Sequence, residues 1–299
     1  MTTQPGDQPA QPATAPRHGL RLFLIWLVLA LAADLVIWFV WYPHMPPGDM
    51  SEAARHQQFD IAVLAVSAAP VIIFVLLYFI YSIVVWRARP GDDTDGEPIY
   101  GNTKIQATWI IGTTVIVMWL FVFGTVELVV PAGAGAGEGP SPIWKLAGTT
   151  SSTWTPNTNT TLQVQVIGQQ WEFTYRYPSF GGVETPHLVL PVDRDIELHV
   201  TSLDVIHSFW AHDLGVKADA NPGVDNVVYV KANEVRSFSI RCAELCGLFH
   251  GHMFDTGQVV SGPAFLAWIH AEQAQFGPAT GALPPYSTHY NPAPHRRAG

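Results

Sequence analysis

Cysteine is scarce in this chain of 299 residues, which has only Cys242 and Cys246. Two cysteines cannot build the multi-bridge framework of a small disulfide-rich secreted protein. The motif Cys-x-x-Cys-His does not occur, so we expect no covalently attached haem in this chain. The two thiols must therefore be explained by each other and by their immediate neighbours.

Charged residues are also scarce, at 13% of the chain, and the formal net charge is −9. Soluble domains carry about 25% charged residues on average, so this composition favours a chain that inserts into a membrane. The acidic balance offers no basic surface to a phosphate backbone, and we expect no nucleic-acid partner.

Hydrophobic residues make up 48% of the chain, and three long apolar runs are visible at residues 20–42, 61–86 and 109–130. A helix of about 20 apolar residues crosses a bilayer, so the runs predict three transmembrane helices, of which residues 61–130 form a hairpin. Basic residues precede the first run and separate the second from the third: Arg17, Arg21, Arg87, Arg89 and Lys104. By the positive-inside rule these regions are cytoplasmic, and the chain after residue 131 lies outside.

The first run has two interpretations. It could be an export signal cleaved near Ala30-Leu-Ala32, or an extra transmembrane segment that stays in the mature protein. Signal cores span 7–15 apolar residues as a rule, and this run is longer, so we favour retention. The sequence therefore leaves open whether residues 20–42 are cleaved or retained.

The remaining chain is predicted to be one folded domain between weakly structured segments. Period-two alternation in residues 162–166, 196–202, 227–231 and 235–241 predicts short strands, bounded by Gly, Pro and Asp. Many such strands indicate an all-β, cupredoxin-like Greek-key domain, closed by a helix at residues 265–275. The predicted organisation is a disordered cytoplasmic tail at 1–19, the membrane segments at 20–42 and 61–130, a linker at 131–160, the β-domain at 161–275 and a disordered tail at 276–299.

The chemistry is concentrated in residues 242–253. Six potential ligands occur there within twelve positions: Cys242, Glu244, Cys246, His250, His252 and Met253. Thiolate and thioether ligands select soft metals, and a mixture of Cys, His and Met is typical of copper electron transfer. A single copper needs only one Cys, so the second thiol favours a dinuclear copper centre in which both thiolates bridge two ions.

Two simpler interpretations compete with copper. The cysteines could form a disulfide, which is common outside the cytosol, but this leaves His250 and Met253 unexplained. A two-Cys, two-His zinc site is the other alternative, and it gives no role to Met253. Copper accounts for more of the residues.

At these residues the chain resembles subunit II of the haem-copper cytochrome c oxidases, whose dinuclear copper centre is called CuA. The resemblance extends from about residue 59 to about residue 269 and is carried by the 242–253 stretch and three further motifs. Those motifs are Asp204-Val-Ile-His207-Ser-Phe-Trp210, Leu214-Gly-Val-Lys217-Ala-Asp219-Ala-Asn-Pro222-Gly223 and Gly168-Gln-Gln170-Trp171-Glu-Phe173-Thr-Tyr175.

The resemblance implies a ligand set for two copper ions. One copper would take His207 and Met253, and the other would take His250 and the backbone carbonyl of Glu244. Both thiolates, of Cys242 and Cys246, would be shared. It also implies that the Glu244 carboxylate faces a magnesium ion shared with subunit I.

It further implies a function. Cytochrome c, or a cytochrome c domain, would deliver electrons near Trp171, and the copper centre would pass them to the haem of subunit I. Oxygen is reduced there to water with proton translocation, and subunit III is a further partner in a bacterial plasma membrane. Phe173 we expect to pack in the β-domain.

The exported part is acidic. From residue 131 onward it has 14 Asp and Glu against nine Lys and Arg, which favours a basic electron donor. The carboxylates nearest His207 in sequence are candidates for a docking patch, with an ordinary solvated loop as the alternative: Asp204, Asp213, Asp219 and Asp225.

Three positions depart from the family pattern. Gln106 stands where the family commonly has a Glu at the mouth of a proton channel, and an amide cannot titrate. Thr113 replaces a usual Pro, and Val224 replaces an Arg that follows Pro222-Gly223. Gln106 is therefore a proton-uptake position only by resemblance, and a solvated loop end is the simpler interpretation.

The sequence also allows a different class of function. A membrane-anchored carrier of a single copper ion, outside any oxidase, would need neither the second thiol nor the helical hairpin. A quinol oxidase subunit would lack the copper ligands, and nitrous oxide reductase would need a second large domain for which this chain has no room.

Overall fold

The computed structural model describes residues 17–87, 91, 100–129 and 161–280. The predicted linker at 131–160 lies outside these residues, as do the predicted tails apart from residues 17–19 and 276–280. The chain divides into two units, one formed by Met1–Pro43 and Val63–Thr108 and the other by His44–Ala62 and Trp109–Gly299.

Three helices are long and apolar enough to cross a membrane, as predicted. They are α1 (His18–Val36), which continues through a π-helical turn at Ile37–Trp41 and a 3₁₀ turn at Tyr42–His44, α2 (Glu52–Val84) and α3 (Thr103–Val129). Helix α2 begins nine residues before the predicted start at residue 61. Its first turns contain Glu, Arg, His and Gln, which interrupt an apolar run but are compatible with a helix.

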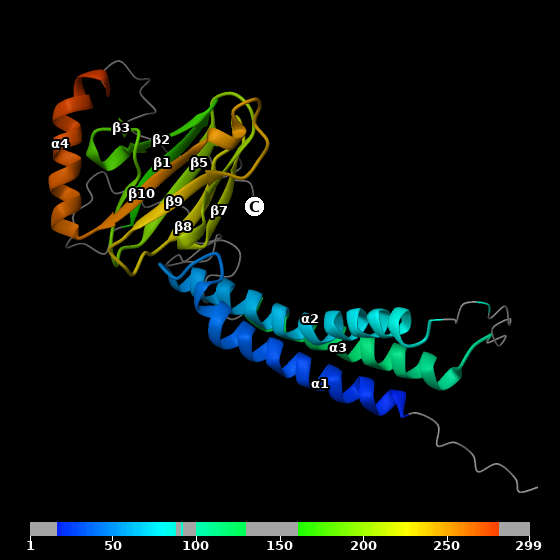
Figure 1. Cartoon of the computed structure of the whole chain (residues 1–299). Helices are drawn as coiled ribbons and strands as arrows, with labels where there is room; N and C mark the ends of the chain where they lie inside the picture. The colour runs from blue at the N-terminus through cyan, green and yellow to red at the C-terminus, as the bar shows by residue number, and fades with distance from the viewer. Residues whose placement is uncertain (1–16, 88–90, 92–99, 130–160, 281–299) are drawn as a thin grey trace, which may run out of the picture. The chain divides into compact units, whose positions relative to one another are not determined.

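Helix α1 packs on α2 in the first unit (Figure 1). The indole N–H of Trp26 donates to the carbonyl oxygen of Pro70 at 2.8 Å, and His18 Nδ1 lies 2.7 Å from the Tyr81 hydroxyl. Position 18 thus faces 81 while position 26 faces 70, so the two helices run antiparallel.

Helix α3 begins at a side-chain cap. The Asn102 Oδ1 accepts the backbone N–H groups of Lys104 and Ile105, which satisfies donors that the first turn leaves without helical partners. Gln106 is exposed one turn later.

The second unit contains two five-stranded sheets (Figure 1). The first has the order β3-β2-β1-β5-β8 and the second the order β4-β10-β9-β6-β7. The strands are β1 (Leu162–Gln169), β2 (Glu172–Tyr177), β3 (Val183–Thr185), β4 (Val189–Pro191), β5 (Ile196–Ser202), β6 (His207–Ala211), β7 (Val216–Ala220), β8 (Asn226–Val230), β9 (Ser237–Cys242) and β10 (Phe254–Val260). Three long apolar helices with a ten-stranded β-domain confirm the predicted fold class.

The core of the β-domain is built from apolar residues at alternate positions of its strands, and Val164, Val166 and Leu198 have no exposed surface. The polar residues between them are covered to different degrees, since Gln163 lies partly in solvent and Gln165 is buried. Helix α4 (Gly262–Thr280) covers one side of the core through Phe265 and Ile269, which are four residues apart and therefore on one helical face. It contains the helix predicted at residues 265–275.

The segment before α2 completes this core, which the sequence did not predict. Met50 has no exposed surface and belongs to the same hydrophobic cluster as the strands. Its N–H donates to the Asp213 carbonyl at 3.0 Å, and its own carbonyl accepts the Asn233 N–H at 2.9 Å. The Ser51 hydroxyl donates to the Leu214 carbonyl at 2.8 Å. Residues 49–51 are thus a structural part of the β-domain.

Candidate metal centre

The loop between β9 and β10 is closed at its base. Strand β9 ends at Cys242, and the backbone N–H of Cys242 donates to the Met253 carbonyl at 3.0 Å. The neighbouring strand β6 begins with His207, and it pairs with β9 through Phe209 opposite Cys242. The pairing therefore brings residues from positions 207 and 242–253 to one end of the sheet.

Three sulfur atoms meet at this end. Cys242 Sγ lies 3.8 Å from Cys246 Sγ, which lies 3.7 Å from Met253 Sδ. A disulfide has its sulfurs about 2.05 Å apart, and both cysteines are free here. All three side chains are buried. The disulfide alternative is therefore not the state of these residues in the structure.

Nitrogen and oxygen atoms surround the sulfurs. His207 Nδ1 lies 4.0 Å from Cys242 Sγ, and His250 Nδ1 lies 3.5 Å from Cys246 Sγ. The backbone carbonyl oxygen of Glu244 lies 3.2 Å from Cys242 Sγ, while the residue itself is exposed. The structure thus brings all six predicted ligand positions together.

This donor set fits a soft metal. The ligand atoms of His207, Cys242 and Cys246 all lie within 4.8 Å of one another. Sulfurs 3.8 Å apart can share an ion, because metal–thiolate bonds are about 2.3 Å long. A thioether and a carbonyl complete a set that soft metals accept.

The Cys246 thiol is held in its protonated form without a metal. Burial, with the neighbouring Cys242 thiol, raises the pKa of Cys246 to about 12. Metal binding must therefore release protons from this site, since the thiolate is the ligand.

Asp204 orients the imidazole of His207. Its Oδ1 lies 2.9 Å from His207 Nε2, which leaves Nδ1 to face the sulfurs. The backbone N–H groups of Gln170 and Val205 also donate to this carboxylate, at 2.7 and 2.6 Å. Burial would raise the pKa of Asp204, but the hydrogen bond with His207 and those from the backbone outweigh it, and the pKa lies below its usual value. A carboxylate behind a metal-binding His commonly fixes the ring orientation.

Two glycines make room for the site. A Cβ at Gly168 would lie 3.1 Å from His207 Cδ2. Gly247 has φ +123°, which L side chains rarely adopt, and a Cβ there would lie 2.9 Å from Gln170 Nε2. Gln170 Nε2 donates to the Cys246 carbonyl at 2.8 Å, so it anchors the backbone at the second thiol. Sequence reasoning missed these three roles, because they depend on contacts between β1 and a distant loop.

The comparisons with known proteins agree on one family. Residues 183–260 match the model of the cytochrome c oxidase subunit II periplasmic domain. The cytochrome c oxidase subunit 2 of Thermostichus vulcanus is 28% identical over 84% of this chain and 86% of its own length. The chain covers less of a second relative, from Synechocystis: identity is 30%, over 58% of this chain and 59% of that protein. The crystal structure of the periplasmic domain of subunit II from Bradyrhizobium japonicum is 33% identical, with 38% of this chain and 95% of that domain covered and a TM-score of 0.38.

These comparisons support the identification of the chain as a cytochrome c oxidase subunit II. The resemblance inferred from the motifs is thereby confirmed, and the chain is a component of an oxidoreductase complex. The matched region contains His207, both cysteines and Met253, so the cluster lies within the part that defines the family.

Trp171 lies against the metal-binding loop of this subunit II. The residue is half-buried, and its ring stands edge-on to Phe249 with centroids 4.9 Å apart. A Cβ at Gly247 would lie 3.2 Å from its Cζ2. Its indole Nε1 is buried and has no hydrogen-bond partner in the described part of the chain. Phe173 is 4% exposed and packs edge-on to Phe209, as expected of a core residue.

The predicted docking carboxylates do not form one surface. Asp225 is 5% exposed, and both of its carboxylate oxygens lie 3.1 Å from the buried His199 Nδ1, so its prediction as a surface docking residue is wrong. Sequence position could not show that the β7–β8 turn points this side chain at β5. Asp213 is partly buried and accepts the Ser239 N–H, whereas Asp204 and Asp219 are exposed.

Two other histidines lie outside the cluster. His252, one of the potential ligands in residues 242–253, is exposed on the loop. His212 is partly buried, with Nδ1 3.0 Å from the Pro47 carbonyl oxygen. Gln106 belongs to the first unit.

Proposed function

We propose that this chain is subunit II of a respiratory cytochrome c oxidase that receives electrons at a dinuclear copper centre. Cytochrome c, or a cytochrome c domain, would be the donor, and the haem of subunit I would be the acceptor, where oxygen is reduced to water with proton translocation. The observation that carries the proposal is the pair of free thiols 3.8 Å apart, joined by His207, His250 and Met253 in a chain of this family.

The chain's own residues would hold two copper ions. Cys242 and Cys246 would be shared, His207 and Met253 would complete one ion, and His250 with the Glu244 carbonyl would complete the other. When bound, the copper pair supplies one-electron redox chemistry. The protein's part is to hold the donors fixed: His207 and Met253 are 0% and 2% exposed, so neighbouring side chains restrict their movement and exclude water.

Trp171 is proposed as the point where electrons enter the subunit. Its ring lies against Gly247 and Phe249, which follow Cys246 in the chain. This gives a short path, partly through contact and partly through covalent bonds, to Cys246. Part of the residue remains accessible to a donor. Asp204, Asp213 and Asp219 remain candidates for donor docking through their negative charge.

The other assignments follow from family membership. Subunit I and subunit III are the proposed partners in a bacterial plasma membrane, with the β-domain on the outer face. The exposed Glu244 carboxylate is proposed to face a magnesium ion shared with subunit I. Gln106 is proposed at the proton-uptake position, where its amide could hydrogen-bond but not titrate.

The test is a copper count with electron paramagnetic resonance on the full chain in detergent, loaded with copper under reducing conditions. Two coppers per chain, with one unpaired electron shared between them, are expected. Cys242→Ser should reduce this to at most one localised copper. One copper in the unmodified chain would instead favour the single-copper carrier, and zinc alone would contradict both.

A further inference from the structure

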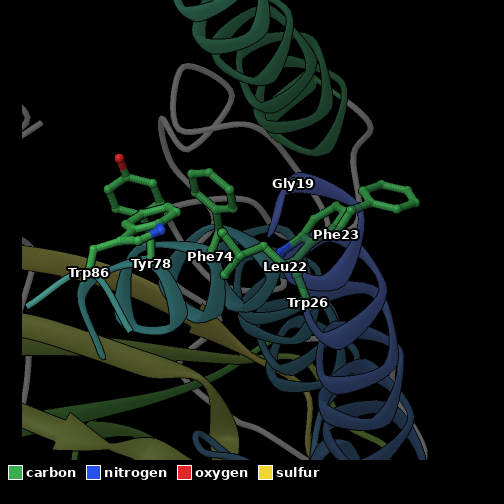
Figure 2. A pocket seen from close by; sticks show the side chains of 7 residues that line it. All are labelled: Gly19, Leu22, Phe23, Trp26, Phe74, Tyr78 and Trp86. Atoms are coloured by element: carbon green, nitrogen blue, oxygen red, sulfur yellow. The ribbon is translucent and has the colours of Figure 1, made fainter. Parts of the chain in front are cut away.

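A groove lies between α1 and α2 in the first unit, far in sequence from the copper ligands (Figure 2). Its volume is about 410 Å³, within the range of small-molecule sites of about 300–1,000 Å³. Aromatic rings from both helices form its walls. The lining residues are Gly19, Leu22, Phe23 and Trp26 of α1, with Phe74, Tyr78 and Trp86.

The groove exists because the contacts that join the helices leave space between them. Trp26 bonds to Pro70 at one end, and His18 bonds to Tyr81 at the other. Between these contacts lies Gly19 of α1, where an added Cβ would have no atom within 4 Å. The space is therefore fixed by hydrogen bonds at both ends.

Two residues with N–H donors, His18 and Arg87, are neighbours of this apolar lining without being part of it. The His18 ring lies 5.9 Å from the Trp86 ring, and Arg87 follows Trp86 as an exposed residue. Arg87 makes no ion pair with another described residue. When the Tyr81 hydroxyl donates to His18 Nδ1, the other ring nitrogen, Nε2, carries a hydrogen that can donate to an anion. By the positive-inside rule the end of the groove near His18 is cytoplasmic.

We propose that the groove binds an anionic phospholipid of the cytoplasmic leaflet. An acyl chain would lie against the aromatic rings, and the phosphate would accept hydrogen bonds from His18 and Arg87. Basic pockets between membrane helices on the cytoplasmic side are suited to such headgroups. The proposal concerns α1 and α2 alone and does not depend on the copper centre.

Native mass spectrometry of the delipidated full chain tests this proposal. The chain is titrated separately with phosphatidylglycerol, with phosphatidylcholine of the same acyl chains and with inorganic phosphate. One phosphatidylglycerol is expected to bind, with phosphatidylcholine weaker and phosphate alone not retained. Arg87→Ala should weaken phosphatidylglycerol binding about fivefold, since one basic residue near a lipid surface is worth about 1 kcal/mol.

Two matched controls separate the groove from general attraction. Arg21→Ala removes the same charge from α1, but helical geometry places position 21 on the face opposite Leu22, Phe23 and Trp26, so binding should not change. Gly19→Leu should fill the groove and abolish lipid binding. Gly112→Leu makes the same change on α3, where a Cβ also meets nothing within 4 Å, and should leave binding intact.

Several results would overturn the proposal. Equal affinity for the two lipids, equal effects of Arg21→Ala and Arg87→Ala, or unchanged binding in Gly19→Leu would each contradict it. A photoreactive residue in place of Phe23 provides a second measurement in native membranes. Its crosslinking to another protein, and not to lipid, would show that a helix of a neighbouring subunit occupies the groove.

Discussion

Asp204 and His207 form a fixed pair behind the sulfur cluster, with Asp204 Oδ1 2.9 Å from His207 Nε2. The opposite ring nitrogen, Nδ1, is directed at Cys242. A residue first considered for partner docking therefore also has a task inside the site. The two roles can be separated by experiment.

Asp204→Asn should lower copper affinity about 10- to 100-fold, the usual cost of losing the partner behind a metal-binding His. Competition with a copper chelator measures this in the full chain. Asp219→Asn is the control, because Asp219 is exposed and bonds to Ser208, not to a proposed ligand. Equal copper affinities for the two variants would show that Asp204 does not position His207.

Gly168→Ala should displace the His207 ring, because the new Cβ would lie 3.1 Å from Cδ2. Overpacking of this kind costs roughly 2 kcal/mol, so the variant should bind copper poorly and unfold earlier. Gly251→Ala is the matched change in the metal loop, where a Cβ meets nothing within 4 Å. Copper titration and thermal unfolding of both variants give the comparison, and wild-type behaviour of Gly168→Ala would refute the packing argument.

Trp171→Phe should slow electron transfer from reduced cytochrome c while leaving the copper content unchanged. The smaller ring loses part of the contact with the loop at Gly247, which is the proposed path. Stopped-flow oxidation of the donor by the assembled complex is the measurement. Trp210→Phe, a half-buried tryptophan on β6, is the control and should retain the wild-type rate. If both variants transfer electrons normally, electrons enter elsewhere.

Met50→Ala should destabilise the β-domain by roughly 3 kcal/mol, because it empties a fully buried position. Met45→Ala, at a half-buried position in the same segment, should cost less. Chemical unfolding of the full chain, followed by tryptophan fluorescence, measures both. A β-domain fragment that starts after α3 lacks Met50 altogether and should be less stable than the domain in the full chain.

Asp225→Ala should reduce stability by about 1–3 kcal/mol, because it removes the buried partner of His199 Nδ1. It should leave donor affinity unchanged, since the residue is 5% exposed. Asp219→Asn should show the reverse pattern, with a weaker salt dependence of donor binding and little loss of stability, because the amide oxygen can still accept the Ser208 hydroxyl. Reduced donor affinity in a stably folded Asp225→Ala would restore Asp225 to the docking surface.

The proposed ligand positions could be selected from sequence because five of the six lie in one short loop with a distinctive mixture of Cys, His and Met. Strand β5 was also predicted at its observed bounds, since alternation of Ile196, Leu198 and Val200 marks one buried face. Both signals are local. Spacing along the chain carries them without knowledge of the fold.

The missed features all depend on distant contacts. Gln170 anchors a carbonyl 76 residues away, and Met50 enters a core whose strands begin more than 100 residues later. In the sequence, Asp225 cannot be distinguished from other acidic residues in turns. Only the fold places its carboxylate next to His199. The start of α2 was missed for a different reason, because a search for apolar runs ends where polar helical residues begin.

The separation of the two thiols also affects how readily the metal-free chain is oxidised to a disulfide. The sulfurs would need to approach by about 1.8 Å to form a disulfide, a movement that a short loop can make. Burial opposes that reaction, because a thiol with a pKa of about 12 holds little of the reactive thiolate at neutral pH. Alkaline solution removes this protection, and dissolved oxygen can then take the two electrons and two protons that are lost when the disulfide forms. A loss of two hydrogen masses from the intact chain would then show that Cys242 and Cys246 have formed a disulfide. Such a chain could not bind the metal until a reductant restored the two thiols.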